Sequence, residues 1–292
     1  MKLSYYPGCT LKTQAKELEA SALASLHELG IEATELKRWN CCGVVYSLAD
    51  DNLMNQLAPL RVLIRAQEEG SSHLLTLCSM CYNTLARTNL LVKEQPDKLN
   101  TLNLFMDEEP DYRGEVEVVH LLSLLDQEIG WTAIASRVRR PLSGLKVAPY
   151  YGCKLQRPRP VGIEPPGRFR LLSKLISALG AQIVDNPAAD LCCGSYQAVA
   201  DPPLARELSR RVLEKSAWAG AETLAVSCPL CFHNLSQARQ ALASETGAGT
   251  LPEVVYFTQL MSQAFKAGAS ADVSESAETC QEAERDGISD SY

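Results

Sequence analysis

The sequence predicts an α/β protein made of two homologous halves, each a mostly parallel sheet flanked by helices, with cysteines at the carboxyl edge of its strands. Two observations predict this fold class. Short apolar stretches that suit strands alternate with longer stretches of helical periodicity along the chain. A series of cysteines also occurs twice, beginning once at Tyr5-Tyr6-Pro7-Gly8-Cys9 and again at Tyr150-Tyr151-Gly152-Cys153.

Each copy of the repeat arranges five cysteines in the same order. A lone cysteine is followed by an adjacent pair and a glycine, and then by a Cys-x-x-Cys motif. The first series is Cys9, Cys41, Cys42, Cys78 and Cys81, and the second is Cys153, Cys192, Cys193, Cys228 and Cys231. The repeat predicts a first domain of residues 1–140, a second of residues 141–265, and an acidic, flexible tail of residues 266–292.

The first half is predicted to alternate strands and helices. Residues 2–6 alternate in polarity and are aromatic, which is typical of a short strand. Gly30 ends a helical pattern, and Asp50 or Asp51 is expected to cap a helix that ends at Gly70. The predicted strands are residues 2–6, 31–39, 73–77 and 115–119, and further helices are predicted at residues 11–29, 82–92 and 121–129.

The second half repeats this order. Asp201 followed by Pro202 marks a helix start, since proline suits the first helical turn. The predicted strands are residues 145–151, 182–185, 223–227 and 253–255, and the predicted helices are residues 169–179 and 202–218. Because ligands bind beyond the carboxyl ends of parallel strands, and each motif cysteine follows a strand, each half should gather its five cysteines at one sheet edge.

The composition excludes several classes of protein. With 46% hydrophobic and 22% charged residues, the 292-residue chain has the composition of a soluble globular protein. No apolar run is long enough for a membrane span, and the N-terminus lacks a signal peptide, so a cytoplasmic location is expected. The net charge of −7 argues against nucleic acid as a partner. Cysteines in a reducing compartment indicate metal or redox chemistry.

The cysteine spacing favours an iron–sulfur centre over zinc. Thiolates bind zinc, copper(I) or iron–sulfur clusters, and a structural zinc or an ordinary cubane takes four ligands. Each half supplies five, including two neighbours whose side chains would diverge on an extended backbone. A turn at Gly43 or Gly194 would bring both sulfurs inward. Five thiolates with an adjacent pair suit an extended cluster, with zinc as the remaining alternative.

This duplicated Cys-Cys-Gly pattern resembles the cysteine-rich CCG domains of the B-type subunit of heterodisulfide reductase. The resemblance implies two non-cubane 4Fe–4S clusters. The ligands it implies are Cys9, Cys41, Cys42, Cys78 and Cys81 for one cluster, and Cys153, Cys192, Cys193, Cys228 and Cys231 for the other. It further implies that a small disulfide is cleaved between the clusters, and that a cubane 4Fe–4S protein, similar to the reductase's C-type subunit, passes electrons from a flavin-containing protein similar to its A-type subunit.

Two other functions stay open. Relatives in the wider superfamily serve lactate, glycolate and succinate dehydrogenases, where such clusters would relay electrons without cleaving a disulfide. A zinc-containing scaffold subunit is a weaker alternative. The chain has no flavin or nucleotide fingerprint and no cubane motif of the Cys-x2-Cys-x2-Cys kind, so electrons are expected from a partner protein.

Several other side chains are candidates for the site. Lys154 adjoins a cysteine of the series, and His233 lies two residues beyond another, so both are tentative catalytic residues beside the paired and lone cysteines. The basic residues Lys154, Arg157, Arg159, Arg168 and Arg170 form either an anion clamp or a solvated loop. Tyr5, Tyr6, Tyr150 and Tyr151 either donate hydrogen bonds to sulfur or belong to the core, and His27, His73 and His120 fit core or surface positions better than ligand positions. Cys280 is expected to be a free thiol without a role.

Overall fold

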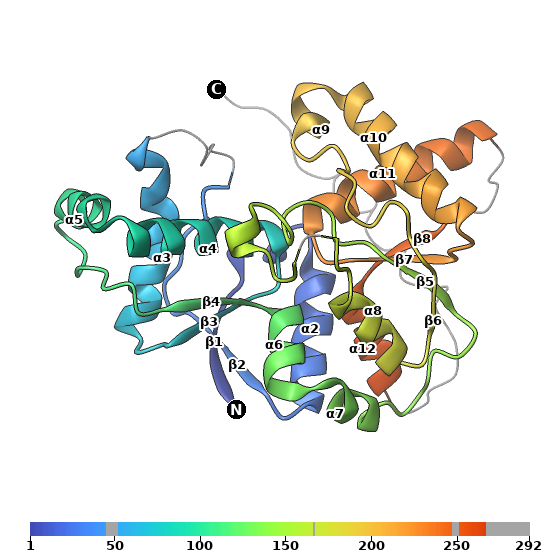
Figure 1. Ribbon diagram of the computed structural model, residues 1–292, viewed down its shortest axis with the longest axis horizontal. Helices are drawn as coiled ribbons and strands as arrows, with labels where there is room; N and C mark the ends of the chain where they lie inside the picture. Colours follow the sequence, from blue (N-terminus) through green and yellow to red (C-terminus); the bar gives the residue numbers. More distant parts are fainter. Residues whose placement is uncertain (45–51, 166, 247–250, 267–292) are drawn as a thin grey trace, which may run out of the picture.

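The computed structural model describes residues 1–44, 52–165, 167–246 and 251–266 (Figure 1). It contains two 4-stranded sheets, and every strand pairing is parallel. The first sheet consists of β1 (Lys2–Tyr6), β2 (Glu32–Glu35), β3 (His73–Thr76) and β4 (Glu117–His120). The second consists of β5 (Lys146–Pro149), β6 (Gln182–Ile183), β7 (Thr223–Val226) and β8 (Glu253–Tyr256). The predicted fold class is confirmed.

The strand order puts a topological switch point next to the cysteines. The orders are β2-β1-β3-β4 and β6-β5-β7-β8, so the chain moves away from the first strand of each half in opposite directions. In the first sheet Tyr5 pairs with Glu35 of β2 and Leu75 of β3. Ligands of open parallel sheets bind where the order reverses, beyond the carboxyl ends of such strands. Cys9 and Cys78 follow β1 and β3 at this place.

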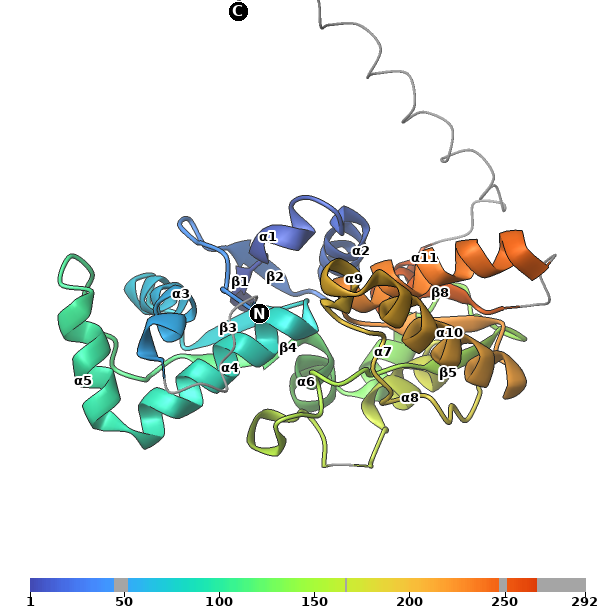
Figure 2. The same cartoon turned by 90° about the horizontal axis from the view of Figure 1, so that it is seen from above.

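Helices fill the crossovers between the strands. The helices of the first half are α1 (Gly8–Leu11), α2 (Lys16–Glu28), α3 (Leu57–Glu68), α4 (Ser79–Glu94), α5 (Pro96–Phe105), α6 (Leu121–Leu124) and α7 (Trp131–Ser136). Those of the second half are α8 (Leu171–Ala178), α9 (Gln197–Ala200), α10 (Pro202–Trp218), α11 (Pro229–Thr246) and α12 (Phe257–Phe265). The pairs α3–α4 and α10–α11 pack side by side in equivalent positions of the two halves (Figure 2).

Some boundaries differ from those predicted. The helix predicted at residues 11–29 is two helices, because α1 ends at Leu11 and α2 begins at Lys16. Asn52 caps the turn before α3 by accepting a hydrogen bond from the Met54 N–H, and Asp50 and Asp51 lie outside the described residues. Asp201 caps α10 as expected, since its carboxylate accepts from the Leu204 N–H at 3.1 Å.

The helix that follows the last strand of each half packs against the other half. Helix α12 follows β8 but lies against α2, and α6 follows β4 but lies against α8, so these four helices gather between the two sheets (Figure 1). The Ser21 and Thr258 hydroxyls are 2.7 Å apart across the α2–α12 contact. The Gln259 amide there donates to the Glu17 carboxylate at 3.3 Å. The two halves therefore share one packed centre.

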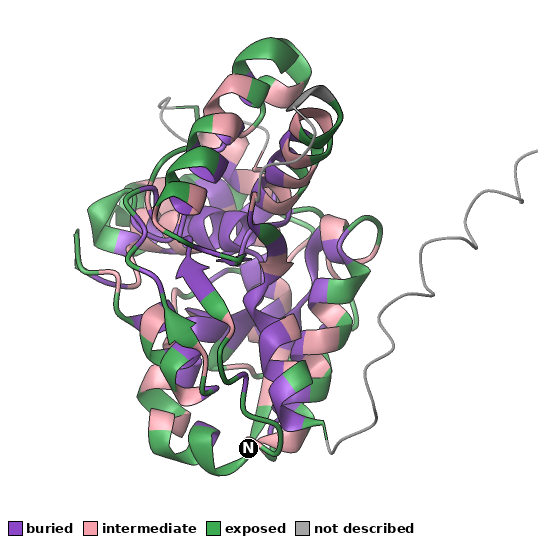
Figure 3. Ribbon diagram, turned by 90° about the vertical axis from the view of Figure 1, so that its right-hand side faces the viewer, coloured by how far each residue is buried: buried purple, intermediate pink, exposed green. Residues whose placement is uncertain are grey.

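The core follows the strands. Figure 3 shows buried residues concentrated in the sheets and on the helix faces turned toward them. All four residues of β7 are buried, which is expected for a strand in a parallel sheet covered on both faces. Among the described residues, no helix is both long and apolar enough to cross a bilayer.

Candidate functional site

The five motif cysteines of the first half come together at the carboxyl edge of its sheet; we call them the first cysteine group. Cys9 lies in α1, the adjacent pair follows β2, and Cys78 and Cys81 flank the start of α4. The Cys9 and Cys41 sulfurs are 3.6 Å apart, and so are the Cys42 and Cys81 sulfurs. The Cys78 thiol contacts Cys81 and helps to raise its pKa.

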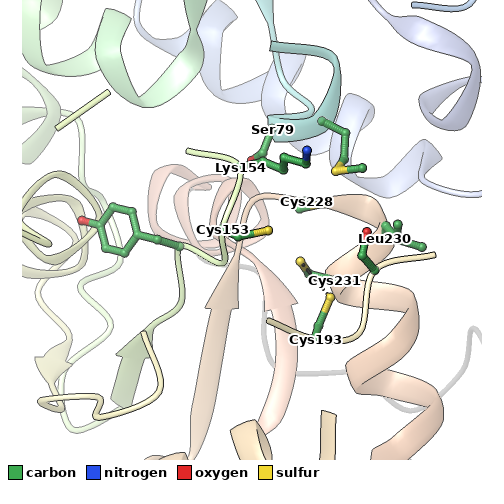
Figure 4. Close-up of a pocket in the computed structure, with 10 residues that line it drawn as sticks. Ser79, Cys153, Lys154, Cys193, Cys228, Leu230 and Cys231 are labelled. Carbon is green, nitrogen blue, oxygen red and sulfur yellow. Dashed lines mark hydrogen bonds between the residues drawn. The ribbon is translucent and has the colours of Figure 1, made fainter. Parts of the chain in front are cut away.

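The motif cysteines of the second half form the equivalent second cysteine group. The Cys193 and Cys231 sulfurs are 3.2 Å apart, and the backbone N–H of Gly194 donates to the Cys192 sulfur at 3.4 Å. Figure 4 shows the sulfurs of Cys153, Cys193 and Cys231 turned toward the same cavity from three separate segments. The predicted gathering of the cysteines is thus seen in both halves. Their role as cluster ligands stays a prediction.

Two glycines allow the chain to pass close to the sulfurs. Gly8 and Gly152 directly precede the first cysteine of each group, and both have positive φ, 71° and 61°. A Cβ atom on Gly8 would lie 2.9 Å from the Cys81 sulfur, and one on Gly152 would lie 3.4 Å from the Cys231 sulfur. A side chain at Gly8 would therefore press on the Cys81 sulfur, whereas one at Gly152 would be in close contact with the Cys231 sulfur and would strain the backbone. This role was not predicted from the sequence, although the repeat contains a glycine at both positions.

The adjacent cysteines are turned inward as expected. Gly43 and Gly194 have positive φ values of 73° and 96°, which side-chain-bearing residues rarely adopt. A Cβ atom on Gly194 would also lie 2.7 Å from the Cα of Ala205 in α10. Ser195 follows with φ of 48°, the one positive value among the described residues other than glycine. The turn after the second pair is therefore conformationally constrained.

Tyrosines at the ends of the first strands hold these loops. The Tyr6 hydroxyl donates to the Asn40 carbonyl at 2.8 Å, and the Tyr150 hydroxyl donates to the Leu191 carbonyl at 2.7 Å. Both carbonyls belong to the residue just before the adjacent cysteines. Of the two interpretations left open for these tyrosines, positioning within the core fits: both are buried, and their hydroxyls bond to backbone oxygen rather than sulfur.

The other two tyrosines of the motif also pack in the core. The Tyr5 hydroxyl donates to the Glu19 carboxylate at 3.2 Å. The Tyr151 hydroxyl accepts from the Leu172 N–H at 2.7 Å, at the start of α8. These contacts tie the strand ends to the helices that follow them.

Polar side chains from α4 and α11 support the adjacent cysteines. The Asn234 amide donates to the Cys193 carbonyl at 3.2 Å, to its sulfur at 3.8 Å and to the Ser195 carbonyl at 2.9 Å. In the first half Thr84, three residues after Cys81 as Asn234 is after Cys231, donates to the Met80 carbonyl at 3.0 Å and lies near enough to Cys42 to help lower its pKa, after the larger effects of Cys41 and Cys81. Neither residue was predicted from the sequence, because the residue type at this position differs between the two copies of the repeat.

In each group one thiol ionises more readily than the thiols it contacts. Hydrogen bonds from Cys41 and Cys81 lower the pKa of Cys42 to about 4. A hydrogen bond from Cys153, together with the Gly194 N–H and the charge of Lys154, lowers the pKa of Cys192 to about 6 despite partial burial. The thiolate is the form that binds metals, so each group is chemically prepared for metal ligation.

The two cysteine groups adjoin one another. Ser79 and Met80, which lie inside the first Cys-x-x-Cys motif, line the cavity of the second group. The Ser79 hydroxyl is 2.7 Å from that of Ser227, the residue before Cys228. The pKa of Tyr196 is raised by burial and then by nearby thiolates of both groups, including Cys42, so this phenol lies within electrostatic range of both.

Contacts from α4 also cross to the loop after Cys153. The Asn83 amide donates to the Lys154 carbonyl at 2.8 Å and to the Arg157 carbonyl at 2.7 Å. The Tyr82 hydroxyl donates to the Val161 carbonyl at 3.1 Å. The loop that carries the first cysteine of the second group is thus fixed by the first half.

The other candidate residues separate into cavity and surface positions. Lys154 lines the cavity of the second group. Arg157 is exposed and pairs with Asp190 at 3.4 Å, and the remaining basic residues of this loop, Arg159, Arg168 and Arg170, are exposed and do not line the cavity. The solvated-loop interpretation therefore holds for these arginines.

The histidines take surface or core positions. His233 is exposed on α11 and does not line the cavity, and His27 and His73 are exposed elsewhere on the surface. His120 is buried, and its Nδ1 accepts from the Leu122 N–H at 3.2 Å. Cys280 lies outside the described residues.

The spacing of the paired sulfurs suits thiolates that share a metal atom. Two thiolates on one tetrahedral metal lie about 3.8 Å apart, given metal–sulfur bonds of about 2.3 Å. The paired sulfurs at 3.2 Å and 3.6 Å are close to this spacing. Within the described part of the chain, however, no three cysteine, histidine or carboxylate side chains are grouped around one point as a single metal ion requires.

Comparison with known proteins agrees with the repeat. Two stretches of the chain, residues 3–86 and 147–236, match the family described as CCG, the cysteine-rich domain. The chain belongs to this family. The matched stretches contain both cysteine groups in full. The matched stretches therefore contain the first three strands of each sheet and the cysteine group at its edge, whereas β4 and β8 lie outside them.

Named relatives cover most of the chain. It is 32% identical over 232 residues to the 8-methylmenaquinol:fumarate reductase membrane anchor subunit of Wolinella succinogenes, covering 79% of this chain and 80% of the relative. It is 29% identical over 271 residues to the B subunit of the ferredoxin:CoB–CoM heterodisulfide reductase of Methanosarcina mazei, covering 89% and 88%.

A solved structure shares the fold. A hypothetical protein from Helicobacter pylori superposes with a TM-score of 0.71 at 12% identity. The match covers 90% of this chain and 49% of that one, so this chain spans about half of its length. At this identity the likeness concerns the fold alone.

Proposed function

We propose that this protein is the iron–sulfur subunit of a cytoplasmic heterodisulfide reductase-like complex. Each cysteine group would hold one non-cubane 4Fe–4S cluster, and a small disulfide would be reduced between them. The observation that carries the proposal is the meeting of the two groups: residues of the first Cys-x-x-Cys motif line the cavity of the second group. Relatives named as the B subunit of heterodisulfide reductases support the same reaction class.

The proposed reaction requires that the chain hold the two groups at a fixed separation and leave them accessible to an electron donor. When bound, the two clusters would each supply one electron to the disulfide, so that the sulfur–sulfur bond breaks and two thiols form with two protons from solvent. The chain holds the two groups at a fixed separation through the hydrogen bonds of Ser79 and Asn83 and through the packing of α12 on α2 and of α6 on α8. It also leaves Cys9, Cys41 and Cys192 exposed at the surface. An electron donor can therefore approach both groups from outside.

The donor would be a partner protein. We propose a cubane 4Fe–4S protein that receives electrons from a flavin-containing protein, as the resemblance to heterodisulfide reductase implies. The M. mazei relative is named as one subunit of a reductase, which supports further subunits here.

A second candidate is an electron relay in a dehydrogenase or reductase complex. The observation that favours it is the W. succinogenes relative, whose name refers to fumarate reduction and to no disulfide. In that case the same two centres would pass electrons without binding a substrate between them.

Metal analysis and electron paramagnetic resonance of the anaerobically purified protein separate these functions. Iron and sulfide analysis with electron paramagnetic resonance should find two clusters per chain; zinc with little iron would reject both candidates. Cys193→Ser should lose iron from the second group, whereas Cys280→Ser, outside the repeat, should leave the iron content unchanged. A new paramagnetic signal when a disulfide is added to reduced protein supports the reductase, and no response to any disulfide or thiol favours the relay.

A further inference from the structure

The residue after the first cysteine differs between the two groups. In the first group Thr10 follows Cys9, and its hydroxyl lies 3.8 Å from the Cys9 sulfur. In the second group Lys154 follows Cys153 and lines the cavity, as Figure 4 shows. At the same position of the repeat, one half therefore carries a neutral side chain and the other a positive charge.

The two nearest cations along the chain of the first group are neutralised. Lys12, three residues after Cys9, forms ion pairs with Glu19 and Glu35, both at 2.6 Å, and Arg38, three residues before Cys41, pairs with Glu68 at 2.8 Å. The corresponding position in the second half is Gln156, which is buried and uncharged. Lys12 therefore does not supply to the first group what Lys154 supplies to the second.

No carboxylate in the described part of the chain forms an ion pair with the Lys154 ammonium, and Asp190 in the same region pairs with Arg157 instead. Its backbone is held in place by the hydrogen bond from Asn83. The side chain is half-buried against the sulfurs, where a charge is screened less than in open solvent.

We propose that Lys154 makes the second cysteine group the more easily reduced of the two centres. This inference rests on the proposed function, because it assumes an iron–sulfur centre in each group. A centre that takes up one electron gains one negative charge, and an adjacent cation stabilises the reduced form more than the oxidised form. A single, partly exposed charge that lines the same cavity as the sulfurs changes the ratio of reduced to oxidised centre about tenfold. A one-electron donor therefore fills the second group first.

Exchange of the two residues tests this inference. The full chain, loaded with iron, is titrated with dithionite and followed by electron paramagnetic resonance. Wild-type protein should show two one-electron transitions. Lys154→Gln should lower the upper transition, with about tenfold less reduced centre at a fixed potential. Lys154→Arg keeps the charge and should keep the potential, and Thr10→Lys should raise the lower transition.

The outcomes separate this inference from the proposed function. Protein that binds no iron rejects both. Protein with full iron whose upper transition is unchanged in Lys154→Gln rejects this inference alone, and so does an equal shift of both transitions. If Lys154→Gln loses iron, Thr10→Lys decides: a raised lower transition supports the role of the charge, and an unchanged one overturns it.

Discussion

Gly8 brings the backbone to the sulfur of Cys81 so closely that a single methyl group would not fit. Gly8→Ala should therefore displace the Cys81 sulfur, in addition to the backbone cost, and if the proposed function holds it should lower the iron content of the first group. Gly30→Ala is the matched control, because Gly30 has a similar φ of 75° but nothing within 4 Å of its Cβ position.

The control should lose only about 1 kcal/mol of unfolding free energy, the cost of a left-handed backbone. Urea denaturation and iron analysis of both variants check the prediction. Equal iron content and equal stability in the two variants would show that the Cys81 sulfur moves aside freely.

His120 should make the free energy of unfolding depend on pH. Burial lowers its pKa to about 3, with the Leu77 backbone opposing the shift, whereas an unfolded histidine titrates near 6.5. Below pH 6.5 the unfolded chain binds a proton that the folded chain does not, so stability falls as the pH falls toward 3. Between pH 7.5 and pH 5 this contributes a loss of about 2 kcal/mol.

The variant His120→Asn tests this coupling. Asparagine keeps an acceptor for the Leu122 N–H but does not titrate, so the variant should lose about 2 kcal/mol less than wild type over the same pH range. Urea denaturation at both pH values measures the difference. A wild-type and a variant curve with the same pH slope would mean that another group carries the dependence.

At the scale of elements, the strands and their order of appearance were predictable, because buried parallel strands are short apolar runs. Helix α5 was not predicted: its segment is polar, and its last residues Leu104 and Phe105 are exposed, so it shows little amphipathic pattern. The break between α1 and α2 was also missed, since Leu11 and Leu18 continue the same helical spacing across it.

The cysteines of the candidate site could be predicted from the sequence, but the side chains that hydrogen-bond to them could not. Repetition alone selected every sulfur that the structure gathers. Asn234 and Ser209 were not selectable in this way, because the contact of each with the Cys193 carbonyl depends on how α10 and α11 pack. Lys154 was identified from its place beside a cysteine, but its difference from Thr10 becomes meaningful only when the two groups are compared in space.

At the scale of the whole molecule, the two halves should fold only together. The predicted boundary between residues 140 and 141 would leave α2 without α12 and α8 without α6. Helix α12, whose Phe257, Leu260, Met261 and Phe265 side chains are buried, would lose the cover that α2 provides. At about 2 kcal/mol for each side chain uncovered, this loss is comparable with the roughly 5–15 kcal/mol that stabilises a typical protein.

Fragments of residues 1–140 and 141–292 should therefore be largely unfolded when separate and regain helical content when mixed. Circular dichroism and gel filtration of each fragment and of the mixture measure this. A stable monomer of either fragment would show that its half is an independent domain.

The reciprocal packing of α6 and α12 also says something about origin. A polypeptide with one copy of this repeat would have a terminal helix without a partner and an uncovered surface that fits such a helix. Two identical chains would therefore complete each other as a homodimer. Fusion of two such genes would keep this exchange of helices within one molecule. It would also remove the requirement for symmetry, so that a threonine can lie beside one set of sulfurs and a lysine beside the other.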